Sequence, residues 1–122
     1  MNNSNIGTHQ AQGLNISILT VQGHSYFRSE DIIRMEAVSN YTYIYFDQHK
    51  PILVAKVLKV YQALLEPFGF IRTHRSHLIN SLHIASIKPK GEVVMKDDST
   101  AAVSRRKRKE VIRHLHQSYV VA

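Results

Sequence analysis

The chain of 122 residues contains no cysteine and no tryptophan, and its nine acidic residues are outnumbered by sixteen Lys and Arg. Without cysteine the chain cannot form a disulfide bond or use a thiolate in catalysis or metal binding. It also lacks any apolar run near the roughly 18 residues that a membrane-spanning helix needs, and it lacks an N-terminal signal pattern. These absences exclude a disulfide-stabilised secreted domain and a helical membrane protein. We expect a cytoplasmic protein without a membrane partner.

The motifs of the common enzyme classes are absent as well. The five glycines are dispersed, so no phosphate-binding glycine loop is present, and there is no nucleophile elbow, zinc-protease motif or carboxylate pair. Three of the eight histidines, His74, His77 and His83, are close enough in sequence to suggest a metal site. No cysteine or carboxylate stands with them in a standard ligand pattern. We therefore predict a protein that is not an enzyme and that binds neither a metal ion nor a cofactor.

The length and composition are those of one globular domain. Hydrophobic residues make up 43% of the chain, which argues against wholesale disorder. The first residues are the exception, because they are mostly Asn, Gln, Ser, Thr, Gly and His. We expect residues 1–14 to form a disordered leader or linker and residues 15–122 to form the folded domain.

The first half of this domain alternates apolar and other residues with a period of two, which is typical of half-buried β-strands. The predicted strands are 16–22, 25–28, 32–38, 41–46 and 51–56. The first two form a hairpin around a turn at Gly23-His24, and one helical turn at 29–31 precedes the third. Five short strands at this spacing predict an antiparallel β domain.

Helical spacing of apolar residues follows later in the chain. It predicts a helix at 57–65, which Pro67 and Gly69 end, and a final helix from an N-cap at Ser104 to about His116. The further predicted elements are strands 70–72, 84–90, 93–96 and 100–103, and a short helix within 76–82.

The positive charge lies in the second part of the chain. Residues 1–50 carry three Lys/Arg and four Asp/Glu, a net charge of −1, whereas residues 51–122 carry thirteen and five, a net charge of +8. A basic surface on one part of a small domain is typical of proteins that bind polyanions, through charge attraction and counterion release. A merely soluble basic protein has the same composition, so charge alone leaves both interpretations open.

The segment THRSHLIN, residues 73–80, places charge beside an apolar pair. Leu78 and Ile79 are expected to face the core, where they would anchor a short helix that displays Arg75 at its start. Ser76 could cap this helix or contact a phosphate. The planar guanidinium of Arg75 matches a guanine edge or a phosphate with two parallel hydrogen bonds.

A structural role is the alternative for the same cluster. Arg72 and Arg75 would then pair with Glu66 or Asp97 as salt bridges, and His74 would hydrogen-bond a backbone carbonyl. We expect the structural role for His74 and the functional role for Arg75.

Two other segments carry side chains suited to nucleic acid. Five successive cations, residues 105–109, precede a narrow apolar stripe in the final helix, and like charges at this spacing oppose the helix unless an anion is bound. A solvated basic face is the alternative. At Ser39-Asn40, between two predicted strands, Asn40 could pair with adenine or supply a left-handed turn. The sequence leaves these two roles open.

Together these segments resemble the LytTR DNA-binding domain, the output module of many bacterial response regulators. The resemblance covers about residues 15–117 and rests on three ordered blocks, which are 31–46 (DIIRMEAVSNYTYIYF), 70–84 (FIRTHRSHLINSLHI) and 97–111 (DDSTAAVSRRKRKEV). It implies a mostly β fold in which small antiparallel sheets stack together with short helices at the periphery. In this family, loops rather than a recognition helix enter successive major grooves of DNA.

The resemblance also implies which residues contact DNA. By motif position, the residues expected to contact bases are Asn40, Arg75 and Arg105. We add as candidates for phosphate contacts Lys56, Ser76, Ser104, Arg106 and Lys109. The implied function is sequence-specific binding of double-stranded DNA for transcription regulation, as in two-component systems.

Domains of this family usually follow a phosphoacceptor receiver domain, which this sequence does not contain. We expect either a stand-alone regulator or the C-terminal part of a longer one, with a homodimer on repeated half-sites. The alternative function is an RNA-binding or single-strand-binding module. It would stack bases on Tyr41, Tyr43 and Tyr45, which share one face of the strand 41–46. We expect these tyrosines to pack between sheets instead.

Overall fold

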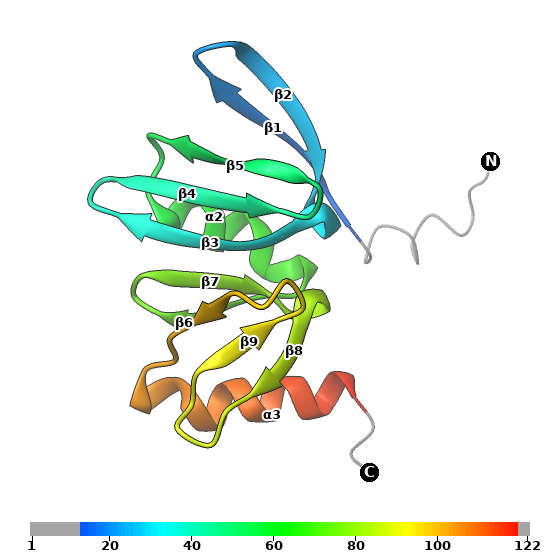
Figure 1. The fold of residues 1–122 in the computed structure, drawn as a ribbon, viewed down its shortest axis with the longest axis vertical. Coiled ribbons are helices and arrows are strands. Elements are labelled where there is room, and N and C mark those ends of the chain that lie inside the picture. Colours follow the sequence, from blue (N-terminus) through cyan, green and yellow to red (C-terminus); the bar gives the residue numbers. More distant parts are fainter. Residues whose placement is uncertain (1–12, 120–122) are drawn as a thin grey trace, which may run out of the picture.

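Ten β-strands dominate residues 13–119, the part of the chain that this computed structural model describes. They form a hairpin, a central five-stranded sheet and a small three-stranded sheet, arranged along the long axis of the molecule (Figure 1). The prediction of a mostly β fold with small antiparallel sheets and short peripheral helices is confirmed. Residues 1–12, which hold most of the predicted leader, and residues 120–122 lie outside the described part.

The central sheet has the strand order β5-β4-β3-β7-β6, and all of its neighbouring strands are antiparallel. Its strands are β3 (Ile32–Val38), β4 (Tyr41–Phe46), β5 (His49–Val54), β6 (Phe70–His74) and β7 (His77–Asn80). The predicted strands 32–38 and 41–46 are confirmed with their bounds. In β4 the alternation of residues matches the two sheet faces, whereas the first four residues of β3 are all buried.

One face of this sheet is covered by the hairpin and by helix α2 (Leu58–Leu65). The hairpin strands are β1 (Asn15–Thr20) and β2 (Gly23–Arg28), and the turn between them is Val21-Gln22 rather than the predicted Gly23-His24. Ser29–Asp31 form the predicted helical turn, as the 3-10 turn η1. The buried side chains of this layer form the first core, which contains Ile16, Ile18, Ile32, Met35, Ile44, Phe46, Val54, Leu58, Tyr61, Leu65, Phe70 and Leu78.

The opposite face packs against the small sheet and helix α3 (Arg108–Ser118). The small sheet has the order β10-β9-β8 and consists of β8 (Ile84–Ile87), β9 (Val93–Met95) and β10 (Thr100–Ala101), three predicted strands with shorter bounds. The second core contains Ile33, Ile71, Ile79, Ile84, Val93, Met95, Ala101, Val111 and Leu115. Neither α2 nor α3 is long and apolar enough to span a membrane.

Strand β7 separates the two cores, because Leu78 belongs to the first and Ile79 to the second. The prediction of a short helix within 76–82 is wrong, since residues 77–80 form this strand and only Ser81–His83 form a 3-10 turn, η3. A strand that is buried on both faces has no polar alternation. Its short apolar run therefore cannot be distinguished from a helix by periodicity.

The tyrosines of β4 face away from the first core. The residues between them are buried, whereas Tyr41 is 49% exposed and Tyr43 and Tyr45 are partly buried. Within residues 13–119, the second core includes no residue of β4 or β5. The expectation that these tyrosines pack between sheets is wrong, because the small sheet packs against β6, β7 and the start of β3 and leaves β4 and β5 uncovered on this face (Figure 1).

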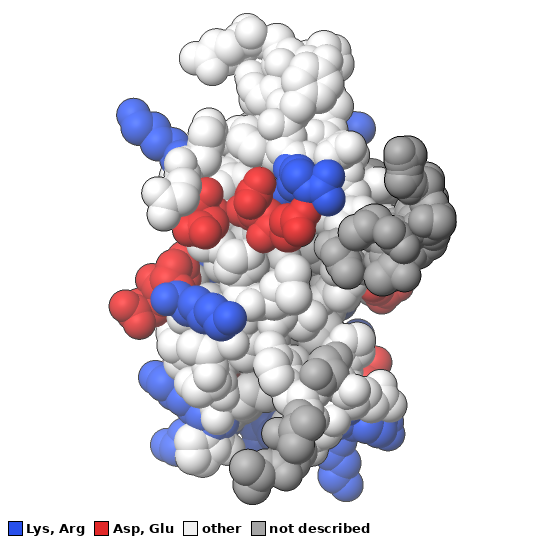
Figure 2. Space-filling view, turned by 90° about the vertical axis from the view of Figure 1, so that its right-hand side faces the viewer, with Lys and Arg blue, Asp and Glu red and all other residues white. Residues whose placement is uncertain are grey.

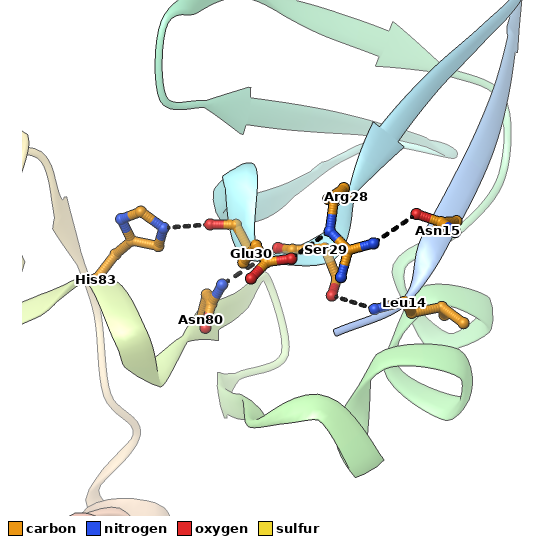
Figure 3. A network of polar contacts seen from close by, with 7 residues as sticks. All are labelled: Leu14, Asn15, Arg28, Ser29, Glu30, Asn80 and His83. Carbon is orange, nitrogen blue, oxygen red and sulfur yellow. Dashed lines mark hydrogen bonds and ion pairs between the residues drawn. The ribbon is translucent and has the colours of Figure 1, made fainter. Parts of the chain in front are cut away.

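A buried asparagine at the end of β7, Asn80, connects this strand with the segment between β2 and β3 (Figure 3). Asn80 is fully buried, and its amide donates to the carbonyls of Ser29 (3.3 Å) and Ile32 (2.9 Å) while its Oδ1 accepts from the N–H of Leu82 (3.0 Å). Ser29 in turn exchanges two hydrogen bonds with Leu14, at 2.7 and 2.9 Å. The network fixes the entry of the chain into β1 relative to the end of β7.

Replacement of Asn80 by alanine is expected to lower the free energy of unfolding by about 2–3 kcal/mol, because it leaves buried backbone groups without partners. Urea unfolding followed by circular dichroism measures this change. The exposed Asn40 is the matched control, and Asn40→Ala should change stability by less than about 0.5 kcal/mol. A loss of less than about 1 kcal/mol in Asn80→Ala would contradict this role for the network.

Candidate nucleic-acid interface

Four connecting segments meet at one end of the central sheet, on the left of Figure 1. They are the β3–β4 turn (39–40), the β5–α2 link (55–57), the β6–β7 turn (75–76) and the segment from β10 to α3 (102–107). In an antiparallel sheet, the end of one strand lies beside the start of its neighbour. The strand order therefore gathers turns from distant parts of the sequence.

Hydrogen bonds join the first three of these segments. The backbone N–H of Ala37 donates to the carbonyl of Ser76 (2.9 Å), which holds the end of β3 beside the β6–β7 turn. The hydroxyl of Thr42, which is fully buried, donates to the carbonyl of Lys56 (2.7 Å). The strands on both sides of the β3–β4 turn are therefore attached to a neighbouring segment.

Thr73 attaches the fourth segment. A β-bulge between Arg72 and His74 leaves Thr73 outside the regular pairing of β6 with β7. The buried Thr73 hydroxyl donates to the carbonyl of Ala102 (2.9 Å), and the N–H of Ser104 donates to the carbonyl of Thr73 (2.8 Å). These two hydrogen bonds fix the position of segment 102–107 relative to the β6–β7 turn.

All eight predicted contact residues lie in these four segments or in the first turn of α3, a surface that we call the cationic end. The candidates with exposed side chains are Asn40, Lys56, Arg75, Arg105, Arg106 and Lys109. Ser76 and Ser104 are partly buried. The structure thus brings residues of all three sequence blocks to the same end of the central sheet.

The salt bridges that were the structural alternative for this segment are not formed. Within residues 13–119 the ion pairs are Arg28 with Glu30, Arg34 with Glu36 and Lys88 with Glu92. The alternative in which Arg72 and Arg75 pair with Glu66 or Asp97 is therefore wrong. Arg72 instead donates to two backbone carbonyls and to Gln62, and the side chain of Arg75 is exposed.

The local geometry of the turns corrects two further predictions, for His74 and Ser104, and excludes one of the two roles left open for Asn40. His74 accepts a hydrogen bond from the N–H of Ser76 through Nδ1 (3.0 Å), rather than bonding a carbonyl. The left-handed residue of the β3–β4 turn is Ser39, with φ of 55°, so Asn40 does not supply that conformation. Ser104 precedes a 3-10 turn, η4 (Arg105–Lys107), and its hydroxyl makes no capping hydrogen bond.

Acidic side chains gather at the opposite end of the central sheet. Figure 2, which views the right-hand side of Figure 1, shows a band of acidic side chains with Lys and Arg beside it, above a lower part with further Lys and Arg. Glu30, Asp47 and Asp97 line one cleft there, and the N–H of Asp47 donates to the carbonyl of Asp31 (2.9 Å). A polyanion that approaches the domain is therefore directed toward the cationic end.

The sequence did not identify the residues that join the connecting segments. Thr42 is a polar residue on the face of β4 that otherwise carries apolar residues. This was the one signal in the sequence that its hydroxyl has a partner. The partner of the Thr73 hydroxyl lies 29 positions away in the sequence. Nothing in the local pattern around Thr73 or Arg72 indicates such a partner, because it becomes a neighbour only in the folded chain.

Known proteins resemble this chain both in sequence and in fold. A sequence model of the LytTr DNA-binding domain matches residues 25–121. One similar solved structure is described as the LytTr DNA-binding domain of a protein classed as a methyl-accepting/DNA response regulator from Bacillus cereus. It has a TM-score of 0.69 and 24% identity, and the match covers 83% of this chain and 94% of that chain, which shows a shared fold. A search of curated proteins found no match.

His77 follows the β6–β7 turn and is partly buried, and within residues 13–119 its Nδ1 has no hydrogen-bond partner. Burial lowers the pKa of His77 below its ordinary value of 6.5. Glu36 opposes this shift of the pKa, whereas Arg34 and His74 add to it. The imidazole of His77 is therefore neutral at pH 7.

The folded protein is expected to lose stability as the pH falls below about 6.5, because the unfolded chain binds a proton at His77 more tightly than the folded chain does. In His77→Gln, the free energy of unfolding should fall less steeply over this range than in the wild type. Urea unfolding at a series of pH values measures the slope. Equal slopes in His77→Gln and the wild type would contradict this account.

Proposed function

Since this chain belongs to the LytTR family of DNA-binding domains, which bind DNA to regulate transcription, we propose that it recognises a specific double-stranded DNA sequence. The four connecting segments of the cationic end enter successive major grooves of the duplex. In this proposal turns on the β scaffold, rather than a recognition helix, present the side chains to the grooves.

The observation that carries this proposal is the set of hydrogen bonds made by Ser76, Thr42 and Thr73, which joins the four segments. Side chains on independent flexible loops would lose conformational entropy on binding a duplex. Joined segments present their side chains already in place, so less free energy of binding is lost to ordering. Arg75 and Arg105 belong to the two segments that Thr73 joins directly.

Three exposed side chains are assigned to base contacts. Arg75 and Arg105 contact guanine, because a guanidinium donates two hydrogen bonds to O6 and N7 in the major groove. Asn40 contacts adenine, because a carboxamide pairs in the same way with N6 and N7. These contacts provide sequence specificity, whereas contacts with the phosphates provide position and register.

Phosphate contacts are assigned to Lys56, Ser76, Ser104, Arg106 and Lys109. The cations of residues 105–109 lie at the N-terminal end of η4 and α3. The helix dipole already places partial positive charge at such an end, so these side chains repel both one another and the helix terminus. A bound phosphate relieves this repulsion, and it therefore stabilises the first turn of α3 as well as the complex.

Residues 15–122 act in this proposal as the output domain of a response regulator, and the residues before Leu14, which itself bonds Ser29 of the domain, act as a linker to an upstream receiver domain. Two such domains bind repeated half-sites in the cytoplasm as a homodimer. Phosphorylation of the receiver domain raises the population of the dimer. The dimer binds more tightly because the second domain meets its half-site at a high effective concentration.

Binding of single-stranded nucleic acid is the second candidate function, because Tyr41 is 49% exposed on the open face of β4. The rest of that face is a poor stacking surface. The Arg34 guanidinium lies 4.0 Å from the ring centroid of Tyr45, and Tyr43 is partly buried. Tighter binding of single strands than of any duplex, abolished in Tyr43→Ala, would favour this second candidate.

Arg75→Ala is expected to weaken binding to the preferred duplex by about 1–3 kcal/mol and to reduce discrimination at one base pair, because it removes a base contact. Lys109→Ala is expected to weaken binding to every duplex alike and to reduce the salt dependence of binding, because it removes a phosphate contact. Fluorescence anisotropy measures both effects, with a duplex selected from a random pool and a panel of its single-base variants.

The control for these variants is Lys50→Ala. Lys50 is an exposed cation near the start of β5, at the end of the central sheet opposite the cationic end. Its replacement should leave the affinity for all duplexes close to that of the wild type. If Arg75→Ala and Lys109→Ala lower the affinity equally at every sequence, direct base contact by Arg75 is wrong.

A further inference from the structure

The guanidinium of Arg72, in β6, donates its hydrogen bonds inside the protein. Nε donates to the carbonyl of His74 (2.9 Å), Nη1 donates to Oε1 of Gln62 (2.7 Å), and Nη2 donates to the carbonyl of Arg75. Two of these acceptors are backbone groups at the β6–β7 turn, and the third is a side chain of α2. Arg72 therefore connects the turn to the helix.

The contacts with Arg72 occur where the regular pairing of β6 with β7 is interrupted. The bulge at Thr73 directly precedes the turn. A planar guanidinium presents its donors in a fixed fork, so it can hold the carbonyls of His74 and Arg75 at set positions. On the same turn, Nδ1 of His74 accepts from the N–H of Ser76. The backbone that carries Arg75 is therefore fixed both before and after this residue.

Helix α2 provides a rigid base for this connection. Its residues Leu58, Tyr61 and Leu65 are buried in the first core. The amide of Gln62 donates to Oε2 of Glu66 (3.1 Å), which orients its Oε1 to accept from Arg72. The turn is thus tied, through two side chains, to a helix that is anchored in the core.

The surroundings of Arg72 differ from those of a phosphate-binding arginine. All three guanidinium nitrogens already donate to acceptors of the protein, and the side chain is partly buried. Burial lowers the pKa of Arg72, although an arginine stays charged at neutral pH. Arg75, three positions further on, is exposed and its guanidinium is available to a ligand. The two arginines are therefore suited to different roles.

We infer that Arg72 is a positioning residue for base recognition, which holds the β6–β7 turn so that Arg75 faces the major groove, and which does not itself contact DNA. This inference rests on the proposed function. It requires that specificity depends on the fork shape of the Arg72 side chain and on Gln62, rather than on the positive charge of residue 72.

Arg72→Lys separates shape from charge, because lysine keeps the charge and loses the fork. We expect this variant to lower the preference for the selected duplex over its single-base variants by on the order of tenfold, as Arg75→Ala does, with the salt dependence of binding unchanged. In the double variant Arg72→Lys/Arg75→Ala, the preference should fall no further than in Arg75→Ala alone, since the two residues act through one contact.

Gln62→Ala removes the helix partner without changing the net charge of the protein, and it should lower the same preference. Leu64→Ala, at an exposed position of the same helix, is the matched control and should bind like the wild type. An unchanged preference in both Arg72→Lys and Gln62→Ala would overturn the inference. A loss in Arg72→Lys that is equal for every duplex would also overturn it, because that is the signature of a phosphate contact.

A second measurement distinguishes failure of this inference from failure of the proposed function. If Arg75→Ala keeps the wild-type preference, then base contact by Arg75 is wrong, whatever Arg72 does. Hydrogen exchange of the Ser76 amide in the free protein then tests, without DNA, whether Arg72 and Gln62 hold the turn in place. Faster exchange in Arg72→Lys and Gln62→Ala, but not in Leu64→Ala, supports it, and unchanged exchange overturns it.

Discussion

The structure depends on one short strand, β7, that is buried on both of its faces. Leu78 completes the core beneath the hairpin and α2, and Ile79 completes the core above the small sheet and α3. At the end of the strand, Asn80 bonds the backbone carbonyls of Ser29 and Ile32. Because both cores and this polar network include residues of one strand, the turn that precedes β7 cannot move independently of the domain. A side chain on that turn therefore extends from a backbone that is held in place.

The separation of charge follows from the same arrangement. Antiparallel strands place alternate connections at opposite ends of the central sheet, so the basic and acidic connections of the sequence are sorted in space. The cationic end holds residues 75–76 and 102–107, and the other end holds Glu30, Asp47 and Asp97 around one cleft. A polyanion is attracted to the first end and repelled from the second, which orients the domain before any specific contact forms.

The sequence predicted strands such as β1 and β4 because each has one buried face, which leaves alternation in the pattern. It failed at β7, since a strand between two cores shows no alternation, and at Tyr41 to Tyr45, since the extent of the small sheet cannot be derived from β4. The cationic positions of the candidate site could be predicted from composition and the family resemblance. The residues that support them, Thr42, Thr73 and Arg72, could not, because their acceptors are brought together by the tertiary fold alone.

In the proposed function, the four joined segments of the cationic end bind duplex DNA together. The most direct test is an NMR titration of the labelled protein with a duplex selected from a random pool. We expect backbone amide shifts to change together at residues 39–40, 56, 75–76 and 104–109, with little change at 30–31, 47 and 97–98. Changes centred on the open tyrosine face of β4 or on the acidic end, with residues 75 and 105 unaffected, would contradict it.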